Sequence, residues 1–292
     1  MPNPLGFVGA WLDRADQLRT DPQAFAAACV DPRARCLALD GVDFVPGDGG
    51  GLRWEPLDPA DDRALMLLGR DDRGIPYFVR EAPRGARIDA RSRTVMRLLP
   101  LLSPQDLALY GGARSLVDWH ARHGFCAVCG SPTGIFRAGW GRRCGGCGAE
   151  HFPRVDPVVI MLAEHDGRVL VGRQRQFPPG MFSALAGFVE PGESLEEAVA
   201  RELFEEAGIR VSDVTYVASQ PWPFPSSLMV GCRAVATDPA LTLDETEIEA
   251  AMWVDRAEVR AALGGDMEAP FMVPPPLAIA RYLLEDWAGW MP

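Results

Sequence analysis

The chain lacks lysine, long apolar runs and any excess of positive charge. All 29 of its lysine-or-arginine positions are arginine, which most simply reflects genome composition. The longest apolar run, Pro157 to Ala163, is too short to cross a bilayer, so we expect no membrane partner. The chain does not begin with a basic segment followed by an apolar one, so the sequence predicts a cytoplasmic protein without a secretion signal.

Acidic side chains dominate the charge that is present. The 40 Asp and Glu residues outnumber the 29 basic ones and give a net charge of −11. This balance argues against general adhesion to nucleic acid, and it means that a dianionic substrate must be held by metal cations and local arginines. With 48% hydrophobic and 24% charged residues, the 292-residue chain has an ordinary globular composition and is long enough for two domains.

Cysteine is scarce except in one array. Four of the seven cysteines follow a C-x-x-C, fourteen residues, C-x-x-C pattern: Cys126, Cys129, Cys144 and Cys147. Glycine follows each pair closely, so the array can form two tight knuckles that place four thiolates tetrahedrally around one zinc ion. A redox dithiol or an iron–sulfur cluster is the alternative, but the closed four-cysteine spacing favours structural zinc, because no coordination position is left for chemistry.

A second pattern runs from Gly187 to Ile209. Ser194 and Glu197 form a Ser-x-x-Glu capping box, and Gly208 can supply a left-handed stop. The spacing therefore predicts a helix from Leu195 to Ala207.

One face of this predicted helix carries Glu202, Glu205 and Glu206 at offsets of three and four residues. Carboxylates this close repel one another unless a cation lies among them, and hard oxygen ligands favour Mg²⁺ or Mn²⁺. The natural partner of such a metal is a phosphate. A solvated acidic face is the alternative, but it has no need of the flanking glycines, Glu193 or Arg201.

The stretch resembles the Nudix box, which reads glycine, five residues, Glu, seven residues, Arg-Glu-aliphatic, one residue, Glu-Glu, one residue, Gly-aliphatic. It matches at every specified position, and a chance match is on the order of one in ten million. Downstream, residues 219–227 read SQPWPFPSS, in which prolines alternate with aromatic residues. We expect a stiff extended loop there, outside the middle of any sheet. This loop resembles the signature of the NADH pyrophosphatase subfamily of Nudix hydrolases.

The resemblance covers most of residues 120–290 and implies two or three catalytic Mg²⁺ or Mn²⁺ ions. The implied metal ligands are the Ala186 carbonyl and the carboxylates of Glu202, Glu205, Glu206 and Glu247. Glu205 is also a candidate base. Glu193 and Arg201 are implied to form an ion pair that braces the glycine loop against the helix.

The resemblance also implies a dinucleotide pocket. Phe152 and Phe188 are implied to flank the substrate base, and a weaker match makes Arg97 a substrate contact. The remaining implied pocket residues are Gln220, Pro221, Trp222, Pro223, Phe224, Pro225, Ser226, Ser227 and Ala280. Members of the family form homodimers whose pockets draw on both subunits.

We expect an α+β chain in three parts. Residues 1–102 would form a strand-rich domain, and residues 103–152 a connector helix and the zinc ribbon. Residues 153–292 would form a Nudix α/β/α sandwich with a mixed sheet. Its predicted strands are Val158–Ala163, Arg168–Arg173, Phe182–Glu190, Val214–Ser219, Leu228–Ala236 and Ala250–Val254, and its closing helix is Leu277–Trp287.

The implied activity is metal-dependent hydrolysis of the pyrophosphate of NADH or NAD to nicotinamide mononucleotide and AMP. The family also removes NAD caps from RNA 5′ ends, and Arg137, Arg142 and Arg143 on the ribbon could offer a basic channel for such RNA. A broader hydrolase of ADP-ribose or dinucleoside polyphosphates is the first alternative. A non-enzymatic nucleotide sensor is the second, although such sensors usually lose carboxylates of the box.

Overall fold

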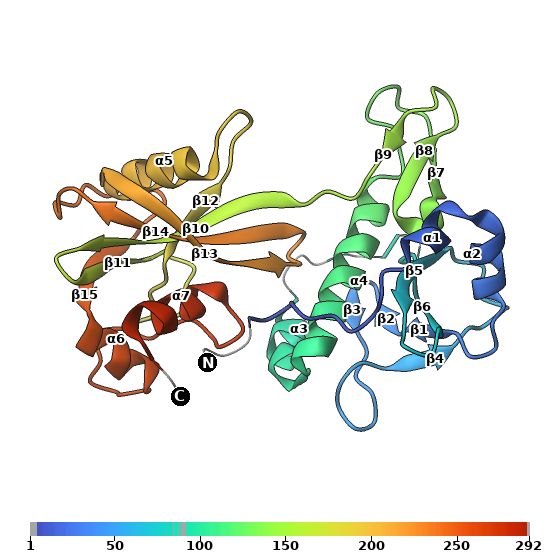
Figure 1. Ribbon diagram of the computed structural model, residues 1–292, viewed down its shortest axis with the longest axis horizontal. Helices are drawn as coiled ribbons and strands as arrows, with labels where there is room; N and C mark the ends of the chain where they lie inside the picture. Colours follow the sequence, from blue (N-terminus) through green and yellow to red (C-terminus); the bar gives the residue numbers. More distant parts are fainter. Residues whose placement is uncertain (1–4, 84, 87, 89–91, 291–292) are drawn as a thin grey trace. The chain divides into compact units, whose positions relative to one another are not determined.

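The computed structural model describes residues 5–83, 85–86, 88 and 92–290. The chain forms two compact units, which are described separately here (Figure 1). Unit 1 comprises Met1–Gly6, Asp156–Pro221 and Ser227–Pro292, and unit 2 comprises Phe7–Val155 and Trp222–Ser226. The first two predicted domains thus fall mainly in unit 2, and the proposed boundary at residue 102 stays a prediction.

Unit 1 is built on a six-stranded mixed sheet. Its strand order is β13-β14-β10-β11-β15, and β12 pairs with β10. Strand β10 runs parallel to β14 and antiparallel to β11 and β12. The strand bounds are β10 Asp156–His165, β11 Arg168–Arg173, β12 Leu185–Phe188, β13 Val211–Trp222, β14 Ser227–Ala236 and β15 Ala250–Asp255.

Helices cover both faces of this sheet. Successive residues of β10 point to opposite faces, so Val159 and Met161 pack toward α5 (Leu195–Ala207), whereas Ile160 and Leu162 pack toward α6 (Arg256–Leu263) and α7 (Ile279–Ala288). Figure 1 shows α5 on one side of the sheet and α6 and α7 on the other. The predicted α/β/α sandwich is therefore confirmed.

Helix α5 has the predicted bounds because local interactions determine both of its ends. The Ser194 hydroxyl accepts a hydrogen bond from the Glu197 amide at 3.2 Å, and the Glu197 carboxylate accepts one from the Ser194 amide at 2.7 Å. Gly208 ends the helix at φ = 71°, in the left-handed region that favours glycine.

Unit 2 contains the N-terminal sheet, a long helix and the zinc ribbon. The sheet has the order β4-β1-β6-β5, and β2 and β3 form a separate two-stranded sheet. Its helical elements are α1 Asp16–Thr20, α2 Pro22–Cys29, α3 Arg93–Leu98, η1 Leu99–Leu101, α4 Pro104–Arg122 and η2 Arg137–Gly139. Its strands are β1 Arg35–Leu37, β2 Leu39–Asp40, β3 Asp43–Phe44, β4 Trp54–Pro56, β5 Leu65–Arg70, β6 Pro76–Arg80, β7 Thr133–Phe136, β8 Gly141–Cys144 and β9 Glu150–His151.

The proline–aromatic stretch differs from its prediction. We expected residues 219–227 to be a loop, but β13 continues to Trp222 and only Pro223–Ser226 form the turn to β14. The strand accommodates Pro221 because β13 lies at the edge of the sheet, the position where proline is tolerated in a strand.

None of the helices within the described residues has the length and apolar character needed to cross a membrane.

Candidate active site and zinc ribbon

A pocket of about 370 Å³ opens in unit 1 beside the acidic face of α5. It brings together five predicted metal ligands that lie up to 61 positions apart in the chain: Ala186, Glu202, Glu205, Glu206 and Glu247. Phe188 and Arg201 also line it. Gly187 lines it as well, together with Gln174, Glu190 and Asp244, which were not predicted as site residues. For Asp244, the acidic run around Glu247 was the available signal.

Glu206 lies deepest among the carboxylates of this pocket. Its side chain is 3% exposed, and among the described residues its Oε2 atom has no hydrogen-bond partner. Burial raises the pKa of Glu206 to about 8, and the neighbouring charges of Glu202, Glu247 and Asp244 add to the rise. A buried carboxylate oxygen without a protein partner suits coordination of a cation.

The position of the Glu202 carboxylate explains why the first residue of the Nudix box, Gly187, is glycine. A methyl group built on Gly187 would place its Cβ only 1.8 Å from the Glu202 Cδ atom, so only glycine leaves room for this carboxylate against β12. Burial raises the pKa of Glu202, although the hydrogen bond from Arg201 opposes the rise.

Arg201 joins the glycine loop to α5. Its guanidinium donates to both carboxylate oxygens of Glu193, with Nε–Oε1 at 2.6 Å and Nη2–Oε2 at 2.9 Å. It also donates to the Phe188 carbonyl at 2.8 Å, to Glu202 at 2.8 Å and to Glu205 at 3.0 Å. Arg201 lowers the pKa of Glu193 to about 2. The predicted ion pair is present and keeps Glu193 charged.

The donor set fits a hard divalent cation, because it consists of carboxylate and carbonyl oxygens. Glu205 is the most accessible of the box carboxylates, with 59% of its side chain exposed. Mutual repulsion favours some separation of these groups. In the described ranges the four ribbon cysteines are the one group of three or more His, Cys, Asp or Glu side chains whose ligand atoms all lie within 4.8 Å of one another.

Two predicted substrate residues are buried within unit 1. Gln220 is fully buried; its Nε2 donates to the carbonyls of Gly6 at 2.9 Å and Leu277 at 2.8 Å. Its Oε1 accepts from the Ile279 amide at 2.9 Å, which caps α7 where Ala278 offers no side-chain cap. Both side-chain donors of Gln220 are therefore used. Ala280 is 4% exposed and packs in the core of unit 1.

The other predicted substrate residues lie in several environments. Phe188 is 60% exposed at the pocket of unit 1, while Phe152 in unit 2 is 50% exposed and contacts Phe136 with ring centroids 6.0 Å apart. Arg97 is exposed on α3. Of the remaining residues, Pro223 and Phe224 are buried, Trp222, Ser226 and Ser227 are half-buried, and Pro221 and Pro225 are exposed.

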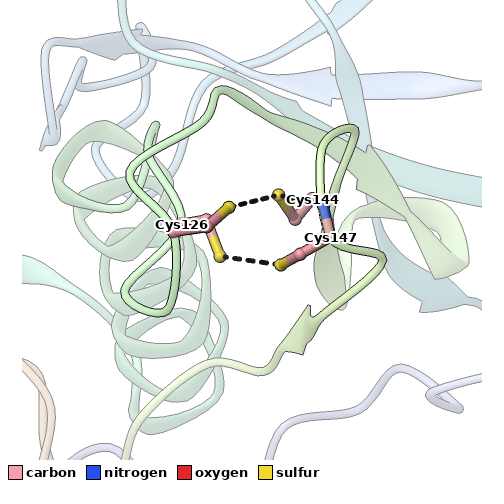
Figure 2. A group of neighbouring side chains, drawn as sticks. Cys126, Cys144 and Cys147 are labelled. Atoms are coloured by element: carbon pink, nitrogen blue, oxygen red, sulfur yellow. Dashed lines mark hydrogen bonds between the residues drawn. The ribbon is translucent and has the colours of Figure 1, made fainter.

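The four cysteines of the ribbon converge as predicted. Their sulfur atoms all lie within 4.8 Å of one another, and Figure 2 shows Cys144 and Cys147 facing the knuckle of Cys126. The amides of Val128, Gly146 and Cys147 donate to cysteine sulfurs at 3.3 to 3.4 Å, which stabilises thiolates. This donor set fits a structural zinc ion.

A histidine lies beside this cluster. The His151 Nε2 atom is 3.3 Å from the Cys126 sulfur, where the ring can support a ligand without replacing one.

The prediction that Arg142 contributes to a basic RNA channel on the ribbon is wrong. This side chain is buried and bonds Thr133, Glu81 and the ring of His120, so it is not available to RNA. Burial lowers the pKa of His120 to about 4, which keeps that ring neutral beside the guanidinium. Arg143 and Arg137 also have acidic partners: Arg143 pairs with Glu150 at 2.6 Å, and Arg137 pairs with Asp16 at 3.5 Å.

Comparison with known proteins agrees with both sites. Residues 153–272 match the family model of the NUDIX domain, and residues 121–152 match that of the NADH pyrophosphatase zinc ribbon domain. The NAD-capped RNA hydrolase NudC of Mycobacterium bovis is 42% identical over 304 aligned positions, which cover 98% of this chain and 94% of that protein.

The NAD-capped RNA hydrolase NUDT12 of Homo sapiens is 46% identical over 202 residues, or 66% of this chain. That match spans 44% of the human protein, so the chain covers less than half the length of this relative. A solved NUDIX hydrolase from Nitrosomonas europaea aligns with 57% of this chain and 93% of its own at 22% identity and a TM-score of 0.43. By its mycobacterial relative and its two domain matches, the chain belongs to the Nudix family, in the branch that carries the NADH pyrophosphatase zinc ribbon.

Proposed function

We propose that the chain hydrolyses the pyrophosphate of NADH or NAD and yields nicotinamide mononucleotide and AMP. The observation that supports this most directly is the buried carboxylate oxygen of Glu206, which has no hydrogen-bond partner among the described residues, in an acidic pocket that Gly187, Arg201, Glu202 and Glu205 of the Nudix box also line. The mycobacterial and human relatives, both named as NAD-capped RNA hydrolases, support a substrate that contains NAD.

Glu202, Glu206, Glu247 and the Ala186 carbonyl would hold Mg²⁺ or Mn²⁺ in this pocket. When bound, such cations neutralise charge on a diphosphate and lower the pKa of water. The Arg201–Glu193 pair keeps the glycine loop against α5 and so holds the Glu202 carboxylate in place.

The reaction needs one bond made and one bond broken. Water attacks one phosphorus, the bond from that phosphorus to the bridging oxygen breaks, and the other mononucleotide leaves with the bridging oxygen. The exposed Glu205 carboxylate can accept the proton of the attacking water and release it to solvent. The exposed Phe188 ring at the pocket can stack on a base of the substrate.

NAD-capped RNA is a second candidate substrate, favoured by the names of the relatives. Because Arg137, Arg142 and Arg143 all have acidic or buried partners, we expect little contribution from ribbon arginines to RNA binding. Turnover of capped RNA should then depend on salt no more steeply than turnover of free NADH.

We also propose that the chain forms homodimers. Sedimentation of the full chain tests this proposal.

Product analysis with competing substrates tests the assignment. We expect kcat/KM for NADH or NAD to exceed that for ADP-ribose and dinucleoside polyphosphates, with nicotinamide mononucleotide and AMP as the only products. A preference for ADP-ribose would favour the broader hydrolase, and nucleotide binding without turnover would favour a sensor.

A further inference from the structure

The turn between β13 and β14 belongs to unit 2, although both strands belong mainly to unit 1. Within unit 2, Phe7, Trp222 and Phe224 contact one another edge to face, with ring centroids 5.3 to 6.0 Å apart. Phe7 and Phe224 are buried, and Trp222 keeps part of its surface exposed. Unit 2 therefore buries the Phe224 ring of this turn and leaves part of the Trp222 ring accessible.

Arg114 on α4 makes the central contact with the turn. Its side chain is 1% exposed, its Nε donates to the Pro223 carbonyl at 3.0 Å, and its guanidinium carbon lies 4.9 Å from the centre of the Phe224 ring. Its Nη1 donates to the Asp43 carboxylate at 3.0 Å, which balances the buried charge. The planar guanidinium of Arg114 thus donates a hydrogen bond to the turn and also stacks on one of its rings.

Two neighbours on α4 extend this contact. The Ser115 hydroxyl donates to the Pro225 carbonyl at 3.2 Å, so α4 satisfies both of these proline carbonyls. A methyl group on Gly111 would lie 2.9 Å from the Phe7 ring and 3.5 Å from Pro223, whereas one on Gly112 would meet nothing within 4 Å. The helix therefore presents a glycine where the turn and Phe7 approach it.

We propose that Arg114 is a positioning residue for the Trp222–Ser226 turn, and that unit 2 serves substrate binding by holding this turn rigid. The proposal rests on the proposed function, because the turn is the predicted site of dinucleotide recognition. Arg114 acts through Trp222 and its neighbours and does not touch the substrate. Disorder in the turn should therefore weaken binding and leave the chemical step nearly unchanged.

Hydrogen exchange and steady-state kinetics of the full zinc-loaded chain test the proposal together. In Arg114→Lys the charge beside Asp43 remains, but the planar fork and the stacking on Phe224 are lost. We expect faster exchange in peptides covering residues 217–229, a KM for NADH raised about tenfold, and kcat within about twofold of the wild type. Ser115→Ala should raise KM about twofold to threefold.

The adjacent glycines provide matched variants. Gly111→Ala should increase exchange in the same peptides, because the added methyl group displaces Phe7. Gly112→Ala, on the exposed side of the same helix, should match the wild type in exchange and in KM.

Unchanged exchange in residues 217–229 of Arg114→Lys would overturn the proposal. Exchange that rises throughout unit 2 while KM stays constant would also overturn it, because Arg114 would then be only structural. If the wild type leaves NADH intact, the proposed function fails, whereas the exchange comparison still decides whether Arg114 holds the turn.

Discussion

At the scale of single residues, the burial of Glu206 makes the stability of the protein depend on pH. Its side chain is 3% exposed and its pKa is raised to about 8, from an ordinary value of 4.5. Between these two pH values the folded chain binds a proton that the unfolded chain releases. The contribution of protonated Glu206 to the free energy of unfolding is therefore fully present below about pH 4.5, and it is lost as the pH rises toward 8.

The first prediction concerns this pH dependence. In buffer free of Mg²⁺ and Mn²⁺, the free energy of unfolding should fall between pH 5 and 8, by at most about 1.4 kcal/mol per pH unit from Glu206. Urea denaturation at several pH values measures the slope. Glu206→Gln should flatten it, and equal slopes in both proteins would show that Glu206 is not the cause.

The second prediction concerns turnover. Glu206→Gln keeps the shape of the side chain but removes the charge that would hold a cation, so kcat for NADH should fall by about two to four orders of magnitude. Circular dichroism should show an intact fold. Glu196→Gln, an exposed position on the same helix, should keep normal turnover. Near-normal turnover in Glu206→Gln would refute its assigned role.

The third prediction concerns Gly187. An alanine methyl group would overlap the Glu202 carboxylate, because the Cβ would lie 1.8 Å from Cδ. We expect Gly187→Ala to lower kcat about a hundredfold or more and to weaken Mn²⁺ binding measured by calorimetry. Gly134→Ala is the control, since its methyl group would meet nothing within 4 Å. Wild-type Mn²⁺ affinity in Gly187→Ala would mean that Glu202 moves away at no cost.

At the scale of helices and strands, the sequence predicted features that depend on residues close together in the chain and missed those that depend on residues far apart in it. The bounds of α5 were predicted because Ser194, Glu197 and Gly208 act within a few positions of the helix ends. The buried role of Gln220 was not predicted, because its hydrogen-bond partners Gly6 and Leu277 lie 214 and 57 positions away in the sequence. A glutamine in a motif with aromatic residues gives no local sign that its amide will be buried.

The fourth prediction follows from these contacts. Gln220→Ala would leave the Gly6 and Leu277 carbonyls and the Ile279 amide without their partners, so the free energy of unfolding should drop by about 2 kcal/mol or more. Urea denaturation measures this loss. Thr215→Ala, exposed on the same strand, should change stability much less. A loss in Gln220→Ala no larger than in this control would mean that water replaces the amide.

At the scale of the whole chain, the two candidate metal sites lie in different units and have different donors. The ribbon offers four sulfurs in unit 2, and the pocket offers oxygens in unit 1. Spacing predicted the four cysteines and the three glutamates of α5, because each motif carries these residues within a short stretch, whereas Ala186 and Glu247 were predicted only from the family resemblance. The assignment of the Trp222–Ser226 turn to unit 2 was not predictable, because it depends on Phe7 and Arg114, which are distant in sequence.

The fifth prediction separates the two sites. Cys129→Ser should abolish the one bound zinc measured by elemental analysis and increase hydrogen exchange across residues 121–152. Mn²⁺ binding that depends on Glu206 should survive, because its ligands belong to unit 1. Retention of a full equivalent of zinc would show that Cys129 is not a ligand.

The most direct test of the central claim is hydrolysis of NADH in heavy-oxygen water with Mg²⁺, followed by mass spectrometry of the products. We predict that a single heavy oxygen enters the phosphate of either nicotinamide mononucleotide or AMP, and that Glu206→Gln forms little labelled product. Release of free nicotinamide, or phosphates without the label, would contradict the attack of water on the pyrophosphate.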